Sequence, residues 1–357
     1  MFDETNENKS IKKTLKELTG LFGVSSQEES IFEYIKGYCK NLVDDINIDN
    51  FGNIIANIYS DKNDAKTLMF EAHTDRVGFM ISDISDDGKI KFSALGGIDD
   101  RTLPYSNVVF ERSESNSDSA HNDALHGIIM TDKKAESTDK PPKIDEMFIF
   151  TGYSKDELKG RISIGDKAII DSGFIELMGN SVCSGAMDNR AGVTAVLYAL
   201  KKIDRTKLKY NIKILFSSEE ELGLHGGYTG TLDAAADAAI VVDVTHGMTP
   251  DSKDMVGVFK LGCGAVICRG PNLSFRHSKK LIELADKQNI PFEIEVAPTH
   301  SGTTAWAIQM SGGGTPVMLV SVADKYMHTN VEVISIDDVE AVSKLLCAAA
   351  EEGVGIE

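Results

Sequence analysis

In the first seventy residues, apolar side chains recur first at the spacing of helices and then in short runs typical of strands. Residues 15–22 and 31–38 carry apolar side chains at helical spacing, and 23–26 (Gly-Val-Ser-Ser) breaks the pattern between them. Three strand-like runs follow at 46–49, 54–59 and 67–72. The last of these has the continuous apolar character of a buried strand and ends at His73. The pattern therefore predicts two helices followed by three strands.

The pattern of apolar and polar residues is different between Val77 and about Glu176. Short alternating stretches, separated by Gly, Asp and Pro, lie at 78–84, 89–94, 107–110, 127–130 and 167–170. This is the pattern of a small β domain. Within it, residues 111–143 are polar and poor in apolar side chains, so we expect a mobile loop there.

Strands and helices alternate again after Glu176. Apolar strands are expected at 212–216, 238–242 and 316–322, and helices at 188–203, 274–288, 303–310 and 336–352. We expect the helix at 188–203 to be amphipathic. Alternation of this kind implies an α/β fold with a mostly parallel sheet flanked by helices. One domain of residues 1–76 and 177–357 would thus be interrupted by an inserted domain of residues 77–176.

Charge and cysteine content narrow the class of protein. The 357 residues carry a formal net charge of -18, which disfavours nucleic acid and anionic membranes as partners. The same charge would attract the free amino terminus of a peptide, although solubility alone accounts for it. Five cysteines without a zinc-site spacing indicate reduced thiols and a cytoplasmic protein. The polar first thirteen residues predict no signal peptide, and no apolar run is long enough to span a membrane.

Five acid and imidazole side chains lie where chemistry is usually placed in α/β proteins, after apolar runs or beside glycine-marked turns. They are His73, Asp188, Glu221, Asp243 and His328. Each one alone is more often structural: an aspartate can cap a helix, and an acidic run such as 219–221 is usually a solvated loop. Three further loop histidines, at positions 225, 246 and 300, mean that residue type alone does not choose among them.

Three details favour a metal site. Asp75 could hold the second ring nitrogen of His73, as metal-bound histidines require. The Glu219–Glu221 run lies between apolar segments, so its carboxylates need a compensating positive charge, which a divalent metal would supply. Asp188 could bridge two cations, and Glu220 would then be left as a base. These residues predict a two-metal hydrolase.

The motifs taken together resemble a known family, the co-catalytic metallo-aminopeptidases that form tetrahedral twelve-subunit shells. Its members are called glutamyl or leucyl aminopeptidases and often carry the label cellulase-like. The resemblance runs from about Ile11 to Glu352. It rests on His73-Thr74-Asp75, Leu103-Pro104, Gly165-Asp166, Asp188-Asn189-Arg190-Ala191-Gly192, Glu220-Glu221-Leu222-Gly223, Asp243-Val244-Thr245 and Tyr326-Met327-His328-Thr329.

The resemblance implies a role for each site residue. His73 and Asp243 would bind one divalent metal ion, Glu221 and His328 a second, and Asp188 would bridge the two. Glu220 would be the catalytic base, and Asp75 would orient His73. Zinc is the expected metal, and cobalt or manganese would suit the same ligands.

The resemblance also implies an assembly and a substrate. The catalytic domain would comprise residues 1–76 and 177–357, and the insertion at 77–176 would be a small β-barrel that mediates contacts in a homo-oligomer, with twelve subunits as in that family. The substrates would be short peptides with a free amino terminus, cleaved by a water that the two metals activate.

The chain departs from the family pattern at three positions. Arg76 stands where an acidic residue is common, and we expect it either to turn away from the metals or to bind an acidic substrate side chain. Thr304 replaces an aspartate, and Lys325 replaces an arginine. These departures leave the six central residues intact but affect the expected side-chain preference.

Three other functions are weighed against an aminopeptidase. A related two-metal deacylase or carboxypeptidase would use the same core, and ordered release of residues from the amino end would distinguish it. A non-catalytic assembly protein on this fold should have lost Glu220 or a ligand, and all are present. A glycosidase would need an aromatic platform, but the chain has one tryptophan, Trp306, and no aromatic cluster near the glutamates.

Overall fold

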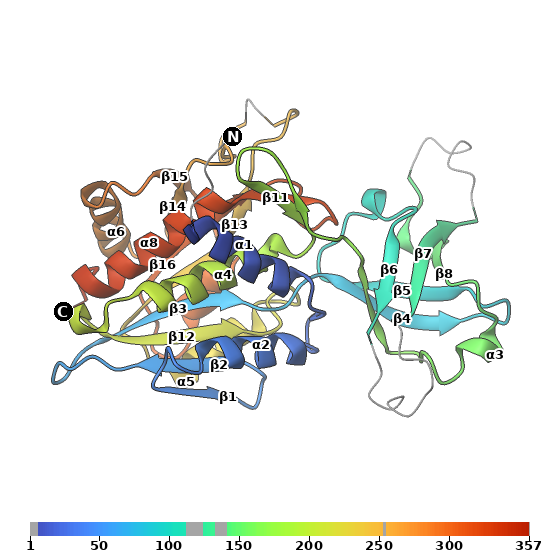
Figure 1. Ribbon diagram of the computed structural model, residues 1–357, viewed down its shortest axis with the longest axis horizontal. Coiled ribbons are helices and arrows are strands. Elements are labelled where there is room, and N and C mark those ends of the chain that lie inside the picture. Colours follow the sequence, from blue (N-terminus) through green and yellow to red (C-terminus); the bar gives the residue numbers. More distant parts are fainter. Residues whose placement is uncertain (1–5, 112–123, 133–140, 253–254, 357) are drawn as a thin grey trace.

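The structure is a computed structural model that describes residues 6–111, 124–132, 141–252 and 255–356. It has two lobes, a larger one built on a wide sheet and a smaller barrel that projects from one end (Figure 1). No helix in these described ranges is both long and apolar enough to cross a membrane. The predicted mobile loop at 111–143 lies largely outside the described residues, apart from Glu111, 124–132 and 141–143. Of these, residues 126–131 form a paired strand, so the prediction of a loop is wrong there.

Eight of the described strands form the sheet of the larger lobe, in the order β1-β2-β12-β3-β13-β16-β14-β15. Their bounds are β1 (Asp45–Ile48), β2 (Ile54–Ile58), β3 (Thr67–His73), β12 (Asn211–Ser217), β13 (Ala238–His246), β14 (Ala265–Arg269), β15 (Phe292–Val296) and β16 (Val317–Asp324). The four central strands β12, β3, β13 and β16 run parallel. They are apolar and almost wholly buried, as a sheet covered on both faces requires. The predicted mostly parallel sheet is confirmed.

Helices cover both faces of this sheet. One face packs against α1 (Asn6–Thr19), α2 (Glu29–Cys39), α4 (Met187–Lys202), α6 (Phe275–Lys287) and α8 (Ile336–Glu352). The other face packs against the shorter α5 (His225–Ala234) and α7 (Thr304–Met310). The sequence predicted neither α5 nor the strands β14 and β15, because their apolar runs are short.

Helix α4 is not the amphipathic helix that the sequence predicts. Every residue from Met187 to Leu200 is buried, because α4 packs against β3 and β13 and also against α1 and α8. Two of its polar residues make hydrogen bonds inside the protein: the Arg190 guanidinium donates to the Gly23 carbonyl at 3.2 Å, and the Asn189 amide to the Val242 carbonyl at 2.8 Å. The polar residues that suggested a solvent-exposed face of the helix therefore make contacts inside the protein.

The smaller lobe is a closed antiparallel barrel in the order β4-β5-β8-β7-β6-β9. Its strands are β4 (Gly78–Ile84), β5 (Ile90–Leu95), β6 (Asn107–Phe110), β7 (His126–Thr131), β8 (Met147–Phe150) and β9 (Lys167–Ile170), and a short helix α3 (Lys155–Leu158) precedes β9. The barrel has its own apolar core, with Phe79, Phe92 and Ile149 near its centre. The first and last strands pair, with Phe79 opposite Ala168. The predicted small β-barrel between the two halves of the α/β fold is confirmed.

A small three-stranded sheet carries the chain from the barrel back to the larger lobe. It consists of β10 (Ile175–Glu176), β11 (Ser181–Ser184) and β17 (Glu332–Ser335). The antiparallel pairing of β11 with β17 sets Ser184 opposite Glu332. This register brings the segment after His328 next to the start of α4, where Asp188 lies.

Candidate metal centre

The candidate residues gather at one edge of the parallel sheet. His73 is the last residue of β3, and its register partner Ser217 is the last residue of β12, four positions before Glu221. Asp243 lies on β13, next to β3 in the sheet. Since the carboxyl ends of parallel strands meet at one edge, this edge is the usual ligand site of an open α/β sheet.

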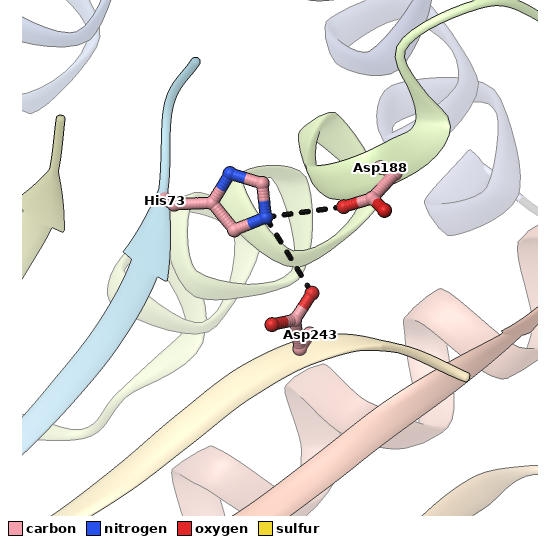
Figure 2. Close-up of side chains that lie close together, drawn as sticks. All are labelled: His73, Asp188 and Asp243. Carbon is pink, nitrogen blue, oxygen red and sulfur yellow. Dashed lines mark hydrogen bonds and ion pairs between the residues drawn. The ribbon is translucent and has the colours of Figure 1, made fainter. Parts of the chain in front are cut away.

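His73, Asp188 and Asp243 form the first group, which we call the inner group (Figure 2). The His73 Nε2 atom lies 3.0 Å from Asp188 Oδ1 and 3.6 Å from Asp243 Oδ1. The three side chains come from the end of β3, the start of α4 and β13, and all three residues are buried. One imidazole nitrogen and two carboxylate oxygens thus converge on one point, as the ligands of a metal ion do.

Asp188, Glu221 and His328 form the second group, which we call the outer group. The His328 Nε2 atom lies 3.2 Å from Asp188 Oδ2 and 3.4 Å from Glu221 Oε1. Asp188 therefore turns one carboxylate oxygen toward each group. That is the arrangement a bridging carboxylate needs between two cations.

Several residues of the site have left-handed backbone conformations that side chains other than glycine rarely adopt. They are Ala186, Glu219, Leu224, Tyr326 and His328, with φ values between 50° and 64°. Each such residue costs about 1–3 kcal/mol and persists only where its surroundings hold it. The loops that carry Glu221, Asp188 and His328 are therefore held in shape by specific contacts.

Asp75 supplies several of those contacts. Its carboxylate is fully buried and lies 3.4 Å from His73 Nδ1, on the side of the ring away from Asp188. It also accepts hydrogen bonds from the backbone N–H groups of Glu220 at 2.9 Å and Glu221 at 3.1 Å, and from the Ser25 hydroxyl at 2.6 Å. One carboxylate thus ties the His73 ring to the loop of the two glutamates.

Glu332, which is not among the residues predicted from the sequence, holds the loop of His328 and the start of α4 in the same way. One of its buried carboxylate oxygens accepts the N–H of His328 at 2.7 Å, and the other accepts those of Met187 at 2.6 Å and Asp188 at 3.3 Å. Burial, then the Asp188 charge, raises the pKa of Glu332 to about 8. A signal was present in Val331-Glu332-Val333, where an acid interrupts an apolar stretch four residues after His328.

A second unpredicted acid, Asp324, lies at the end of β16. It is 1 % exposed, and neither of its carboxylate oxygens has a hydrogen-bond partner among the described residues. Burial, reinforced by the charge of Glu332, raises the pKa of Asp324 well above its usual range. The region behind the bridging aspartate is therefore strongly acidic.

The electrostatics of the two groups fit a positively charged ion. Although burial favours the neutral ring, the carboxylates of Asp188 and Glu221 raise the pKa of His328 to about 11. Burial raises the pKa of Glu220 well above its usual range, and that of Asp243 also rises. The Glu221 Oε1 atom is buried without a hydrogen-bond partner. Crowded carboxylates and imidazoles with an unpaired oxygen are a donor set suited to divalent cations.

A cavity of about 470 Å³ opens onto both groups. Both ligand groups and the Glu220 carboxylate line it, and Glu220 ligates in neither group. The cavity continues past Asp243 along Val244, Thr245 and His246. Two of the other loop histidines lie elsewhere: His225 pairs with Glu219 at 3.0 Å, and His300 packs against Trp306.

The three departures from the family pattern lie outside this cavity. Arg76 is 4 % exposed and does not line it, so the expectation that Arg76 binds an acidic substrate side chain is wrong. Its guanidinium approaches Gly185, where a Cβ atom would come within 2.9 Å of it, and it faces the charge of Glu332. The buried Thr304 hydroxyl donates to Glu71 at 2.5 Å, and Lys325 pairs with Val333 through the backbone.

Comparison with known proteins gives one consistent result. The family model for M42 glutamyl aminopeptidase matches residues 52–345. A protein of Acetivibrio thermocellus named as an aminopeptidase is 33% identical over 347 residues, covering 94% of this chain and 97% of its own length. Among solved structures, an aminopeptidase of the archaeon Desulfurococcus kamchatkensis superimposes with a TM-score of 0.89 at 28% identity, covering 97% of this chain and 96% of that one. The TET1 peptidase of Pyrococcus horikoshii, described as assembling into a tetrahedron or a large octahedral shell, gives 0.82 at 28% identity, covering 96% and 99%.

Proposed function

Because the chain belongs to the M42 glutamyl aminopeptidase family, we propose that it is a dinuclear metallo-aminopeptidase that removes amino-terminal residues from short peptides. The observation that carries the proposal is the pair of ligand groups sharing Asp188 on the wall of one cavity. His73 and Asp243 would hold one ion, Glu221 and His328 the other, and Asp188 both. Two divalent cations bound in this way lower the pKa of a water molecule and polarise the carbonyl of the scissile bond.

Glu220 is the residue that we assign to proton transfer. Its carboxylate lines the cavity beside both groups but belongs to neither, so it is free to take a proton from the attacking water. Burial raises the pKa of Glu220, which helps it to hold that proton until the leaving amine accepts it. Asp75, which binds the Glu220 backbone N–H, would hold Glu220 in a fixed position relative to His73.

Substitution of Glu220 tests this assignment. We expect Glu220→Gln to lower the hydrolysis of aminoacyl chromogenic substrates by about 100- to 10,000-fold, because the proton acceptor is lost while the shape is kept. The metal content, measured by elemental analysis, should stay near that of the parent enzyme. Glu219→Gln is the matched control, since the Glu219 side chain pairs with His225 and does not line the cavity. Unchanged hydrolysis in the Glu220 variant would refute the role of base.

Zinc is the metal that we propose for both positions. Each group offers one imidazole nitrogen and two carboxylates, with Asp188 shared, which matches the three-ligand pattern of catalytic zinc sites. Cobalt and manganese accept the same donors, so the assay should follow activity as each metal is added to stripped protein.

We further propose that the inserted domain of residues 77–176 joins subunits into a homo-oligomer of twelve chains in the cytoplasm. The barrel exposes large apolar side chains that such contacts would cover: Met80, Tyr105, Ile128, Phe150 and Ile164. The five cysteines are all free, as in a reducing compartment. Light scattering tests the assembly, and a monomer or dimer at micromolar concentration would refute it.

A further inference from the structure

The cavity has one acidic wall residue that the metal chemistry does not use. Glu295 lies on β15, the outermost strand of the sheet, and its half-buried side chain lines the cavity beyond the ligands. Its Oε1 atom accepts a hydrogen bond from the Thr245 hydroxyl at 3.0 Å. The Cys268 thiol also hydrogen-bonds to Glu295, and both partners are neutral, so these two contacts do not compensate its charge.

The position of Glu295 relative to the metal ligands determines which part of a bound substrate it can contact. Thr245 lies two residues beyond Asp243 on β13, so both side chains project from the same face of the strand. Two residues of a strand span about 7 Å. The α-amino nitrogen of a substrate lies only about 2.5 Å from its own carbonyl carbon, whereas the tip of an extended lysine side chain lies several ångströms farther away. Glu295 is therefore placed for the end of a long side chain rather than for the amino group next to the scissile bond.

The balance of charge in the cavity favours a cation at this position. Two divalent ions would carry four positive charges, and Asp188, Glu221, Asp243 and the base Glu220 supply four negative ones. Glu295 is the remaining acid of the cavity wall, and the described residues that line the cavity include no Lys or Arg. His246 also lines the cavity, and its side chain is largely exposed. A partly desolvated carboxylate with no fixed cation opposite it gains most from a charged ligand.

We propose that Glu295 determines the specificity of this enzyme by binding the cationic side chain of an amino-terminal lysine or arginine. The inference rests on the proposed aminopeptidase function and adds the substrate class to it. Peptides that begin with glutamate or aspartate would place a second anion against Glu295 and are disfavoured. The preference of this chain thus differs from the one in the family's description.

Substrates matched in length but not in charge test the proposal. The metal-loaded enzyme would be assayed with the p-nitroanilides of lysine, norleucine and glutamate. We expect kcat/KM for lysine to exceed that for norleucine by about 10- to 100-fold, the range that a hydrogen bond to a charged group supports. Glutamate should be the poorest of the three. A norleucine substrate that is cleaved as well as the lysine substrate would overturn the inference and leave the aminopeptidase function standing.

Two variants assign the preference to one carboxylate. Glu295→Gln should bring the ratio of lysine to norleucine near one. Glu293→Gln should keep the parent ratio, because Glu293 is on the same strand, two residues away, but does not line the cavity. A fall in kcat/KM by the same factor for all three substrates would contradict the proposal, since it would place Glu295 at the α-amino group.

A binding measurement keeps the test independent of turnover. Calorimetry on the metal-loaded Glu220→Gln variant would compare lysinamide with norleucinamide. We expect lysinamide to bind about tenfold more tightly. The difference should vanish when Glu295→Gln is added. Equal affinities refute the inference, whereas absence of hydrolysis by the parent enzyme, with the difference in binding preserved, refutes only the proposed function.

Discussion

The inner and outer ligand groups share Asp188 but are built in different ways. In the inner group, His73 and Asp243 lie on adjacent strands of the sheet, and their side chains are 2% and 5% exposed. In the outer group, Glu221 and His328 lie on loops, and the His328 side chain is 31% exposed. His328 also has a left-handed backbone conformation, with φ of 61°. The inner group is therefore positioned by regular structure, and the outer group by hydrogen bonds to its loops.

This difference shows where the metal centre is vulnerable. Strand pairing fixes the inner ligands, so few single side chains are needed to hold them. Of the outer ligands, His328 depends on Glu332, which binds the His328 N–H and the start of α4, whereas Asp75 binds the Glu221 N–H. Single substitutions should therefore affect the two groups to different extents.

Removal of the shared ligand Asp188 should affect the inner and the outer group alike. Asp188→Asn replaces one of the two oxygens that face His73 and His328 and would remove the negative charge shared by the two proposed ions. We expect loss of both metals and a fall in kcat/KM of at least about a thousandfold, since each ion contributes to activation of the water. Elemental analysis checks this result. Retention of two ions per chain would show that Asp188 does not bridge them.

Substitution of Glu332 should affect mainly the outer group. In Glu332→Gln, an amide N–H group faces backbone N–H donors that now bind a carboxylate oxygen. We expect about a 10- to 100-fold loss of affinity for one metal ion, as is usual when a partner of a ligand is removed, with the other ion retained. Metal titration measures both affinities, and Glu283→Gln, an exposed surface change, is the control. Equal weakening of both ions would contradict the separation of the groups.

Chelation should remove the two ions in order. Distorted backbone at the outer group costs about 1–3 kcal/mol, and its histidine is open to solvent, so the outer ion should be lost at about tenfold lower chelator concentration. Activity should disappear with the first ion and return when zinc or cobalt is added. Dialysis against graded chelator, followed by metal analysis, gives the order. Simultaneous loss of both ions at every chelator concentration would contradict the predicted difference in affinity between the two groups.

Ser25→Ala should have the smallest effect and should act on the inner group through Asp75, which also binds the Glu221 N–H of the outer group. The Ser25 hydroxyl donates to the buried Asp75 carboxylate, which faces His73. Loss of this bond leaves three other interactions of Asp75 in place, so we expect about 1–3 kcal/mol of lost stability and an unchanged metal content. Thermal unfolding with and without metal measures the change. A metal-poor Ser25→Ala protein would show that the inner group is less rigid than the strands suggest.

The sequence indicated the inner group better than the outer one for the same structural reason. His73 and Asp243 follow long buried strands, so their positions could be inferred from apolar runs that end at an edge of the sheet. The contribution of Glu332 was harder to infer. An acid within an apolar stretch marked the residue, but its contacts depend on the pairing of β11 with β17, two segments far apart in the chain.

Helix α5 shows a second limit of the sequence pattern. Its three glycines predict no helix, but a Cβ atom at Gly226 would lie 2.2 Å from the Ser218 carbonyl, so close packing against β12 requires glycine there. A Cβ atom at Gly226 would also come within 2.4 Å of the side chain of Asn53, which is distant in sequence, and such contacts leave no periodic signal.

The pairing of the first and last barrel strands has a consequence for how the chain folds. His73 and Asp188 are 115 residues apart in sequence, and most of the intervening chain belongs to the barrel. Because β4 pairs with β9, a formed barrel brings Phe79 and Ala168 together and shortens the loop that must close to join the two ligands. The saving in chain entropy is on the order of 1 kcal/mol. An insertion that looks like an interruption of the metal site thus lowers the entropic cost of assembling it.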